Sequence, residues 1–370
     1  MFKQGASITT AATHRIKQKN YGLDIARCCA IVLVFSSHSL LNLYSAKIPY
    51  LWYLVFTGVE LFFSLSGFLI GRMLIELFEK HQTELSFRHI SNFWIRRWFR
   101  TLPLYFSLLC IYFIIYNFFL YPVDFDWKYL FFLQSMFNPP PGFMGESWSL
   151  AIEEWFYFVF PALLFLAYLL RKSLTSSGRV EKIFVPLVLM IIGIQIVIRL
   201  FNPGCSSWGC ISVSLHFDAA AYGLIGAYFS KFRNALNKKS AFFVMITGIV
   251  LCLLAAVIKI KVPGYTYLAQ LYFPVNGTGT TLIILGLYYS TFSWKPKAIP
   301  YISKISYSIY LVHLSGVIIP LQHFTRNTNW EGTFLIWMAG LLLTMIISSI
   351  TYRLIEKPFL LIRDRKFPAA

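Results

Sequence analysis

Three ionisable residues in one apolar stretch indicate chemistry inside a membrane. The segment 21–42 is apolar enough to span a bilayer, yet it contains Asp24, Arg27 and His38. Arg27 and His38 are eleven residues apart. On an α-helix this is three turns plus about 20°, so both lie on one face, about 16 Å apart. One helix thus presents a fixed cation near one membrane side and a titratable base near the other. Such groups are costly inside a span and usually functional, although partner helices could also satisfy them in a packing role.

The composition shows that similar apolar stretches recur along the whole chain. Of its 370 residues, 57% are hydrophobic, 18% are aromatic and only 13% are charged. Runs of about 20 apolar residues are the mark of transmembrane helices, whereas β-barrel spans would alternate apolar and polar residues. The net charge of +18 lies in short loops between the runs, which indicates orientation in a membrane rather than nucleic-acid binding. The sequence therefore predicts an all-α, polytopic membrane protein.

The apolar runs predict about ten transmembrane helices. Their ranges are 22–41, 50–77, 102–121, 148–170, 183–200, 213–230, 241–260, 267–290, 305–323 and 334–355. The apolar piece 127–137 is too short to span and is predicted to be interfacial or re-entrant. The whole of 21–358 is expected to form one membrane domain, preceded by an arm, 1–20, and followed by a basic tail, 359–370.

The basic residues between these spans predict the orientation. Of the 33 Lys and Arg residues, five lie inside spans and only four lie on one of the two sides: Lys47, Lys128, Lys261 and Arg326. Because cytoplasmic loops carry the excess of basic residues, both termini are predicted to be cytoplasmic. Cys205 and Cys210 then share an outer loop, where a disulfide is possible in an oxidising compartment. The histidines have neither metal-site spacing nor cysteine partners, so no metal site is predicted.

Six local patterns resemble, in their order, the motifs of the acyltransferase-3 family of integral-membrane O-acyltransferases. LDIARCCAIVLVFSSHS carries Arg27 and His38 with ten residues between them, the spacing of that family's basic residue and histidine. Later motifs are matched by GVELFFSLSGFLIGR (with Glu60 where Asp is commoner), RRWFRTLPLYF, ESWSLAIEEWFYFVFPALL, ISYSIYLVHL and IEKP. No segment resembles the C-terminal esterase-like domain fused to some members. The acceptor specificity that such a domain could supply is expected to be missing or to come from a partner.

The resemblance implies that three arginines bind the donor, an acyl-coenzyme A and most simply acetyl-CoA. Arg97 and Arg100 match the family's Arg-x-x-Arg motif at the cytoplasmic end of a span. Their forked guanidinium groups suit the phosphates of coenzyme A, although position alone would make them ordinary positive-inside charges. Arg27 could hold the pantetheine arm or the thioester oxygen, or pair with Asp24. Arg96 is assigned no role.

His38, in the outer third of its span, is the expected catalytic residue. It could act as the base on an acceptor hydroxyl, or take the acyl group and pass it across the bilayer. Glu153 takes the position of the family's glutamate and lies five residues into its span from the outer side, at a depth comparable with that of His38. It is therefore expected to orient the imidazole, while Glu154 is expected to contact solvent or headgroups. The substrate path, or equally structural hydrogen bonding, is assigned to Glu60, His313 and Asp24. Weaker candidates for the acceptor site are His216 and Asp218.

The residues and the resemblance together predict a multi-pass O-acyltransferase of the bacterial cytoplasmic membrane. It would move an acyl group, expected to be acetyl, from cytoplasmic acyl-CoA to a hydroxyl of a surface glycan, glycolipid or lipid-linked precursor. The alternative is a secondary transporter or proton-coupled permease. A transporter would also explain intramembrane charges, but it predicts inverted repeats and matching broken helices, which this sequence does not show. A non-catalytic scaffold would leave the intramembrane histidine without a role.

Overall fold

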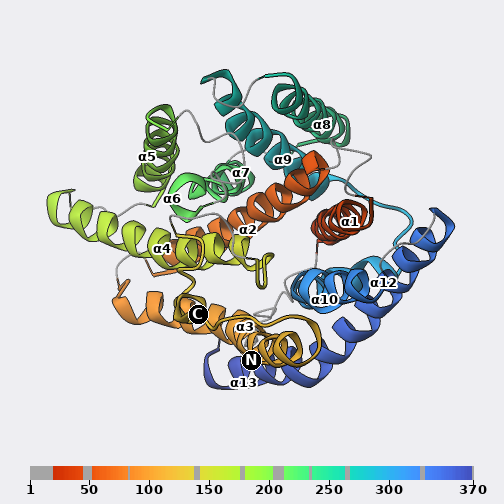
Figure 1. The fold of residues 1–370 in the computed structure, drawn as a ribbon. Helices are drawn as coiled ribbons and strands as arrows, with labels where there is room; N and C mark the ends of the chain where they lie inside the picture. The colour runs from red at the N-terminus through yellow and green to blue at the C-terminus, as the bar shows by residue number, and fades with distance from the viewer. Residues whose placement is uncertain are drawn as a thin grey trace, which may run out of the picture.

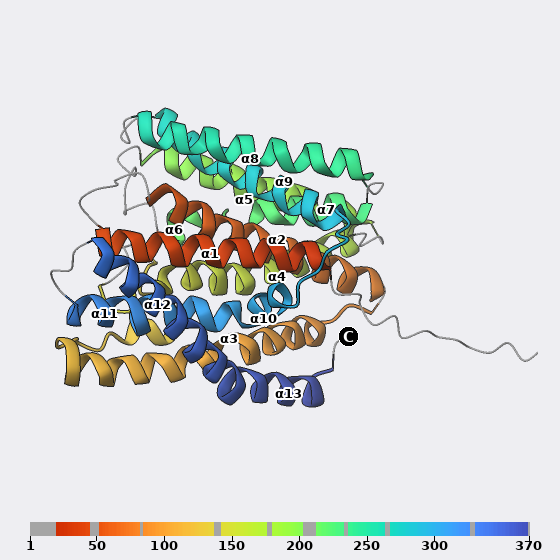
Figure 2. The ribbon, with the colours of Figure 1, turned by 90° about the vertical axis from the view of Figure 1, so that its right-hand side faces the viewer.

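The chain folds into a bundle of long α-helices. A computed structural model describes residues 20–44, 52–81, 84–136, 142–175, 180–202, 212–232, 236–262, 267–325 and 330–368, and within these ranges all regular elements are helical. Eight helical segments of the described ranges are long and apolar enough to cross a membrane. Figure 2 shows the long helices side by side along a common direction. The all-α polytopic fold expected from the apolar runs is confirmed. Cys205 and Cys210 lie outside the described residues, as does nearly all of the N-terminal arm.

The helices follow one another along the chain with short connections. The α-helices are α1 Tyr21–Tyr44, α2 Trp52–Lys80, α3 Phe87–Ile115, α4 Ser147–Thr175, α5 Glu181–Leu200, α6 Val213–His216, α7 Ala221–Phe232, α8 Lys238–Lys261, α9 Tyr272–Tyr289, α10 Ala298–Val312, α11 Ile319–Phe324, α12 Trp330–Thr351 and α13 Lys357–Lys366. Short 3₁₀ or π turns are η2 Tyr116–Leu120, η3 Trp127–Phe131, η5 Tyr267–Leu271, η6 His313–Ile318 and η7 Tyr352–Glu356. Figure 1 shows α2 near the centre of the bundle, with α5 and α8 at its periphery.

Two of the ten predicted spans differ from the other eight. The range 213–230 contains the short helix α6, a turn and α7, and the range 267–290 contains η5 followed by α9. Neither α7 nor α9 meets the length and hydropathy of a lone membrane span. Instead α7 packs against α2, and α9 packs against α8 and α2. Their small and polar residues, such as the run NGTGTT in α9, suit close helix contacts better than lipid.

The contact between α2 and α7 depends on glycine. A Cβ at Gly67 of α2 would lie 1.9 Å from the carbonyl oxygen of Ala220, and a Cβ at Gly223 of α7 would lie 1.9 Å from that of Ser64. Only a residue without a side chain permits this backbone approach. The two helices therefore meet backbone to backbone along the centre of the bundle.

Three further segments can be compared with the predicted ranges: α3, the C-terminal tail and the piece 127–137. α3 begins at Phe87, well before the predicted span 102–121, and carries the arginine motif on one continuous helix. The predicted tail contains most of α13, which packs on α3. The described part of segment 127–137 forms only the short turn η3 and does not span. It folds back on α4, where the indole N–H of Trp155 donates to the carbonyl oxygen of Phe132 at 3.1 Å.

Candidate active site

A cavity in the middle of the bundle gathers four of the predicted site residues. It has a volume of about 230 Å³ and is lined by α1, α2, α3, α4 and α10. Arg27 enters from α1, Arg97 and Arg100 from α3, and Glu153 from α4. Much of the remaining wall is apolar or aromatic, and it also carries the hydroxyl groups of Ser66, Thr101, Ser149, Tyr157, Ser306, Tyr307 and Tyr310. Residues more than 120 positions apart in the chain thus converge on one polar chamber.

Arg27 is held in place by α1 and α10. Its Nη1 lies 3.5 Å from Oδ1 of Asp24 and 3.3 Å from Oγ of Ser303. The Ser303 hydroxyl in turn donates to Oδ1 of Asp24 at 2.6 Å. Asp24 is only 1% exposed and does not line the cavity. The expected pairing of Arg27 with Asp24 is therefore present, and this buried carboxylate supports the arginine from behind.

Glu153 belongs to the arginine cluster. Its Oε2 lies 3.5 Å from Nη2 of Arg97, and its Oε1 accepts a hydrogen bond from Ser66 at 2.8 Å. The guanidinium carbon of Arg97 also lies 4.0 Å from the ring centroid of Tyr157, a cation–π contact. Arg97 is thus held by one carboxylate and one aromatic face.

Arg100 differs from the other two arginines. Within the described ranges its side chain makes no hydrogen bond or ion pair, although it lines the same cavity three residues after Arg97. Residues three apart on a helix lie on the same face, so the two guanidinium groups point the same way. The cavity wall carries three arginines against one glutamate. This excess of positive charge suits an anionic ligand.

A second cavity continues the first toward the end of the bundle formed by the last turn of α2, the first half of α3 and α13. Its volume is about 350 Å³, and it shares Ile70, Met73, Arg97 and Arg100 with the first cavity. Its other charged or titratable lining residues are Glu76, Lys80, His89, Arg96 and Arg363. The basic residues outnumber the single acid, and Arg96, assigned no role from sequence, is among them. We call this end of the molecule the basic end.

His38 pairs with a different residue from the one predicted. Its Nδ1 lies 3.0 Å from Nε2 of His313, at the start of η6, and both rings are buried. The carboxylate of Glu153, the expected partner, contacts Ser66 and Arg97 instead. Similar depth in the membrane did not bring His38 and Glu153 together, because α1 turns His38 toward η6 while α4 turns Glu153 toward α3. The expected partnership is therefore wrong.

Tyr310 connects the cavity with the histidine pair. Its ring lines the cavity, and its hydroxyl lies 2.5 Å from Oγ of Ser149 and donates to the carbonyl oxygen of Glu146 at 3.0 Å. Its own carbonyl oxygen lies 2.7 Å from Nδ1 of His313. The Tyr310 and His313 rings have centroids 5.7 Å apart. Tyr310 therefore contacts both the arginine-lined cavity and His313.

Glu146 is a buried carboxyl group that the sequence reasoning missed. It is 1% exposed, and its Oε2 accepts a hydrogen bond from Ser315 at 2.7 Å, while its Oε1 has no partner among the described residues. Met144, two residues earlier, has φ of 49°, a left-handed conformation that is strained for a residue with a side chain. Glu146 ends the turn-rich run NPPPGFMGE. The only signal was its place directly before α4 in a matched motif.

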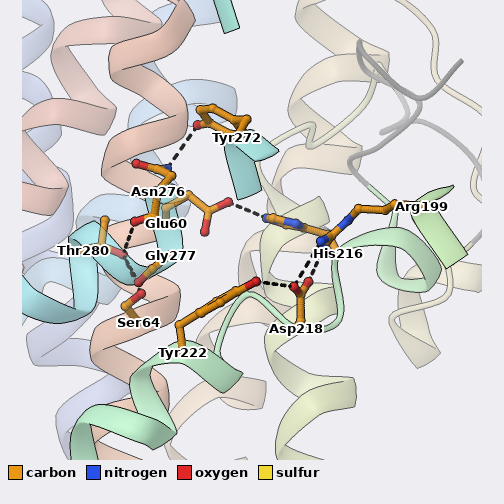
Figure 3. Close-up of polar contacts among 10 residues, drawn as sticks. All are labelled: Glu60, Ser64, Arg199, His216, Asp218, Tyr222, Tyr272, Asn276, Gly277 and Thr280. Carbon is orange, nitrogen blue, oxygen red and sulfur yellow. Dashed lines mark hydrogen bonds and ion pairs between the residues drawn. The ribbon is translucent and has the colours of Figure 1, made fainter. Parts of the chain in front are cut away.

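Glu60 lies in a separate polar cluster on another face of α2, which Figure 3 shows. Its Oε1 lies 2.6 Å from Nε2 of His216. Asp218 forms a two-pronged ion pair with Arg199, one arm of which measures 3.1 Å, and also accepts a hydrogen bond from Tyr222 at 3.1 Å. Glu60 lines neither cavity. The two weaker acceptor candidates, His216 and Asp218, are thus engaged in buried pairs that hold the break between α6 and α7 against α2 and α5.

Glu154 is a buried residue of α4 whose side chain faces α3. It is 5% exposed, so the expectation that it contacts solvent or headgroups is wrong. The side chain turns inward because α3 covers this face of α4.

Among the described residues, no group of three or more His, Cys, Asp or Glu side chains could hold a metal ion.

Comparisons with known proteins show that this sequence is similar to acyltransferases. Residues 20–353 match the family model Acyl_transf_3, described as an acyltransferase domain. The peptidoglycan O-acetyltransferase OatA of Listeria monocytogenes is 28% identical over 379 residues, which cover 91% of this chain and 55% of the relative. The O-acetyltransferase OatA of Staphylococcus aureus is 27% identical over 357 residues, covering 85% and 53%. The chain thus spans about half the length of the curated relatives it matches. No solved structure matches it.

Proposed function

Because the chain belongs to the acyltransferase-3 family, we propose that it is a multi-pass O-acyltransferase of the bacterial cytoplasmic membrane that uses acetyl-CoA as donor. The observation that carries the proposal is the pair of joined cavities, which lead from the basic end to three arginines in the middle of the bundle. The acceptor is a hydroxyl of a surface glycan, glycolipid or lipid-linked precursor. The orientation, with both termini cytoplasmic, rests on the distribution of Lys and Arg.

The two cavities divide the donor between them. The phosphates of coenzyme A bind the cavity at the basic end, where Arg96 and Arg363 contribute forked cations and Lys80 contributes a point charge. The pantetheine arm then passes Arg97 and Arg100, which line both cavities, and the thioester enters the inner one. That cavity, at about 230 Å³, is smaller than the roughly 300–1,000 Å³ of common ligand pockets. Its size favours a short acyl group such as acetyl.

The chemistry requires a base at the thioester and groups that hold the donor. Arg27, held by Asp24, lies about 16 Å from His38 along α1 and binds the pantetheine arm of the donor. His38 removes the proton of the attacking hydroxyl; the oxygen–carbon bond forms, the carbon–sulfur bond breaks and coenzyme A leaves as a thiolate. In the other route His38 attacks first, releases the thiolate, and passes the acetyl group to the hydroxyl. Glu153 holds Arg97 in place in both routes.

The test is the fate of radiolabelled acetyl-CoA with purified protein in detergent and in membranes that contain the native acceptor. Wild type is expected to release CoA, and His38→Ala to release it about 10²–10⁴-fold more slowly, the usual contribution of a general base. Arg353→Ala is the control, because Arg353 is exposed and lines neither cavity. Label retained on wild-type protein but not on His38→Ala indicates the acyl-histidine route. Absence of both acetyl-CoA binding and CoA release in wild-type membranes would refute the proposed function.

A further inference from the structure

We propose that His313 is the positioning residue of His38: it holds the proton of His38 on Nδ1 and so leaves Nε2 as the basic, nucleophilic nitrogen. The inference deepens the proposed function and rests on it for its catalytic consequence. The arrangement of protons itself is a property of the folded protein and can be measured without any reaction. It replaces the carboxylate partner expected from sequence with a second imidazole.

The first step concerns Nδ1 of His313. This nitrogen lies 2.7 Å from the carbonyl oxygen of Tyr310 and 3.2 Å from that of Ile309. A carbonyl oxygen can only accept a hydrogen bond, so Nδ1 of His313 must be the donor and carries a proton. Both carbonyls belong to the preceding turn of the same helical segment, which makes this contact independent of substrate.

The second step concerns the charge of His313. Its side chain is fully buried, and in the described part of the chain its ring contacts are Tyr310, the carbonyl of Ile309 and His38, none of which is an anion. The nearby carboxyl group of Glu146 is bonded to Ser315 rather than to the ring. A buried cation without a counter-charge is strongly disfavoured, so the resting imidazole is neutral. With its one proton on Nδ1, its Nε2 can only accept.

The third step transfers this constraint to His38. Its Nδ1 lies 3.0 Å from the accepting Nε2 of His313, so Nδ1 of His38 must donate and holds the ring proton. The ring of His38 also hydrogen-bonds the backbone of Val34, one turn earlier in α1. The lone pair of neutral His38 is then on Nε2. The reversed arrangement, with His38 accepting at Nδ1, would require a second proton on His313 and leave His38 with its proton on Nε2.

The pair also accommodates the charge that the reaction creates. When Nε2 of His38 takes the hydroxyl proton, the ring becomes a cation, and its Nδ1 proton can shift toward Nε2 of His313. In the acyl route Nε2 of His38 bonds to the thioester carbon and the thiolate leaves. Transfer of the Nδ1 proton to His313 then gives a neutral acyl-imidazole and a protonated His313. In both routes His313 holds the tautomer of His38, as a carboxylate does in a catalytic triad. Unlike that carboxylate, it can take up the Nδ1 proton, and it places no permanent negative charge in the membrane.

A backbone irregularity supports a specific role for this position. α10 is a regular α-helix up to Val312, and the π turn η6 begins at His313. Single π turns inside helices are uncommon and often occur at functional sites.

The experiment measures the protons directly. Nitrogen NMR of full-length, ¹⁵N-histidine-labelled protein in detergent separates protonated from unprotonated ring nitrogens, and His38→Asn identifies the His38 signals. We expect a protonated Nδ1 and an unprotonated Nε2 on His38. In His313→Phe, which keeps a ring but removes the acceptor, we expect the His38 signals to show both tautomers. In His313→Gln, whose amide oxygen can accept from His38 while its NH₂ group donates to Tyr310, the wild-type tautomer should be retained.

Kinetics then connect the tautomer with the reaction. Among folded variants, His313→Phe is expected to lose about 10²-fold or more in CoA release, within the range of a misdirected base, and His313→Gln less than about tenfold. A His38 that carries its proton on Nε2 in wild type, or an unchanged tautomer in His313→Phe, overturns the inference. The predicted tautomer in a protein that neither binds acetyl-CoA nor releases CoA would instead refute the proposed function and leave the geometry of the histidine pair intact.

Discussion

Replacing each α3 arginine with alanine should separate donor binding from stability. Arg97 and Arg100 line the same cavities from one helix, but only Arg97 has an ion pair, with Glu153, among the described residues. We expect Arg100→Ala to weaken coenzyme A binding with little loss of stability. We expect Arg97→Ala to weaken binding and also to destabilise the protein, because the carboxylate of Glu153 then lacks its partner.

The magnitudes follow from the contacts. A hydrogen bond to a charged group contributes about 1.5–3 kcal/mol, and each 1.4 kcal/mol changes Kd tenfold, so each substitution should raise the Kd for coenzyme A by about 10–150-fold. Breaking a buried ion pair costs about 3–5 kcal/mol. Glu153 is 15% exposed and keeps its bond to Ser66, so the lower end of that range applies to Arg97→Ala. The double variant Arg97→Ala with Glu153→Gln should recover most of the stability and none of the affinity.

Two measurements on detergent-solubilised protein test this. Equilibrium binding of coenzyme A gives the Kd, and thermal unfolding monitored by fluorescence gives the change in stability, with Arg353→Ala as the matched arginine control. Binding by Arg100→Ala as tight as that of Arg353→Ala would refute the assignment of the phosphate-binding arginines. Equal stability of Arg97→Ala and Arg100→Ala would show that the pair with Glu153 contributes nothing.

Three further predictions address the supports of the site. Asp24→Asn removes the charge that holds the α1 arginine, and the KM for acetyl-CoA should rise several-fold while coenzyme A still binds at the basic end, as steady-state kinetics and binding will show. Gly67→Ala places a Cβ 1.9 Å from the carbonyl oxygen of Ala220, directly before α7, and should destabilise the protein by about 1–3 kcal/mol. Gly193→Ala, with nothing within 4 Å, should not lower the unfolding temperature. Arg199→Met leaves Asp218 buried without its cation and should cost about 3–5 kcal/mol; a variant as stable as wild type would contradict this.

Most of the membrane architecture could be predicted from the sequence, because each residue contributes its own free energy of transfer from water to lipid. Runs of apolar side chains located the eight membrane-length helical segments, and only the two ranges 213–230 and 267–290 departed from a simple span. Those two are covered by protein rather than lipid. Their polar and glycine residues are tolerated because α2 and α8 supply the contacts, which no local pattern reveals.

Part of the site could also be predicted from local sequence patterns. The α1 arginine was singled out by its place in an apolar span, and the arginine motif and the glutamate of α4 by the family resemblance. The structure brings all four to one cavity. Their depth follows from the rise of 1.5 Å per residue along a helix. Arg363 and His89 were missed, since α13 contributes to the same cavity system only by folding back on α3.

The partners of these groups were decided by the packing of helices. Depth in the membrane is a property of one helix, but the direction in which a side chain points depends on how that helix is rotated against its neighbours. Glu153 and His38 were therefore assigned to each other from similar depth, while in the fold α1 presents His38 to the π turn at His313 and α4 presents Glu153 to Arg97. The chain alone specified how far along their helices the three arginines, His38 and Glu153 lie. Only the folded bundle, through helix rotation and the turn at η6, determined which of them touch.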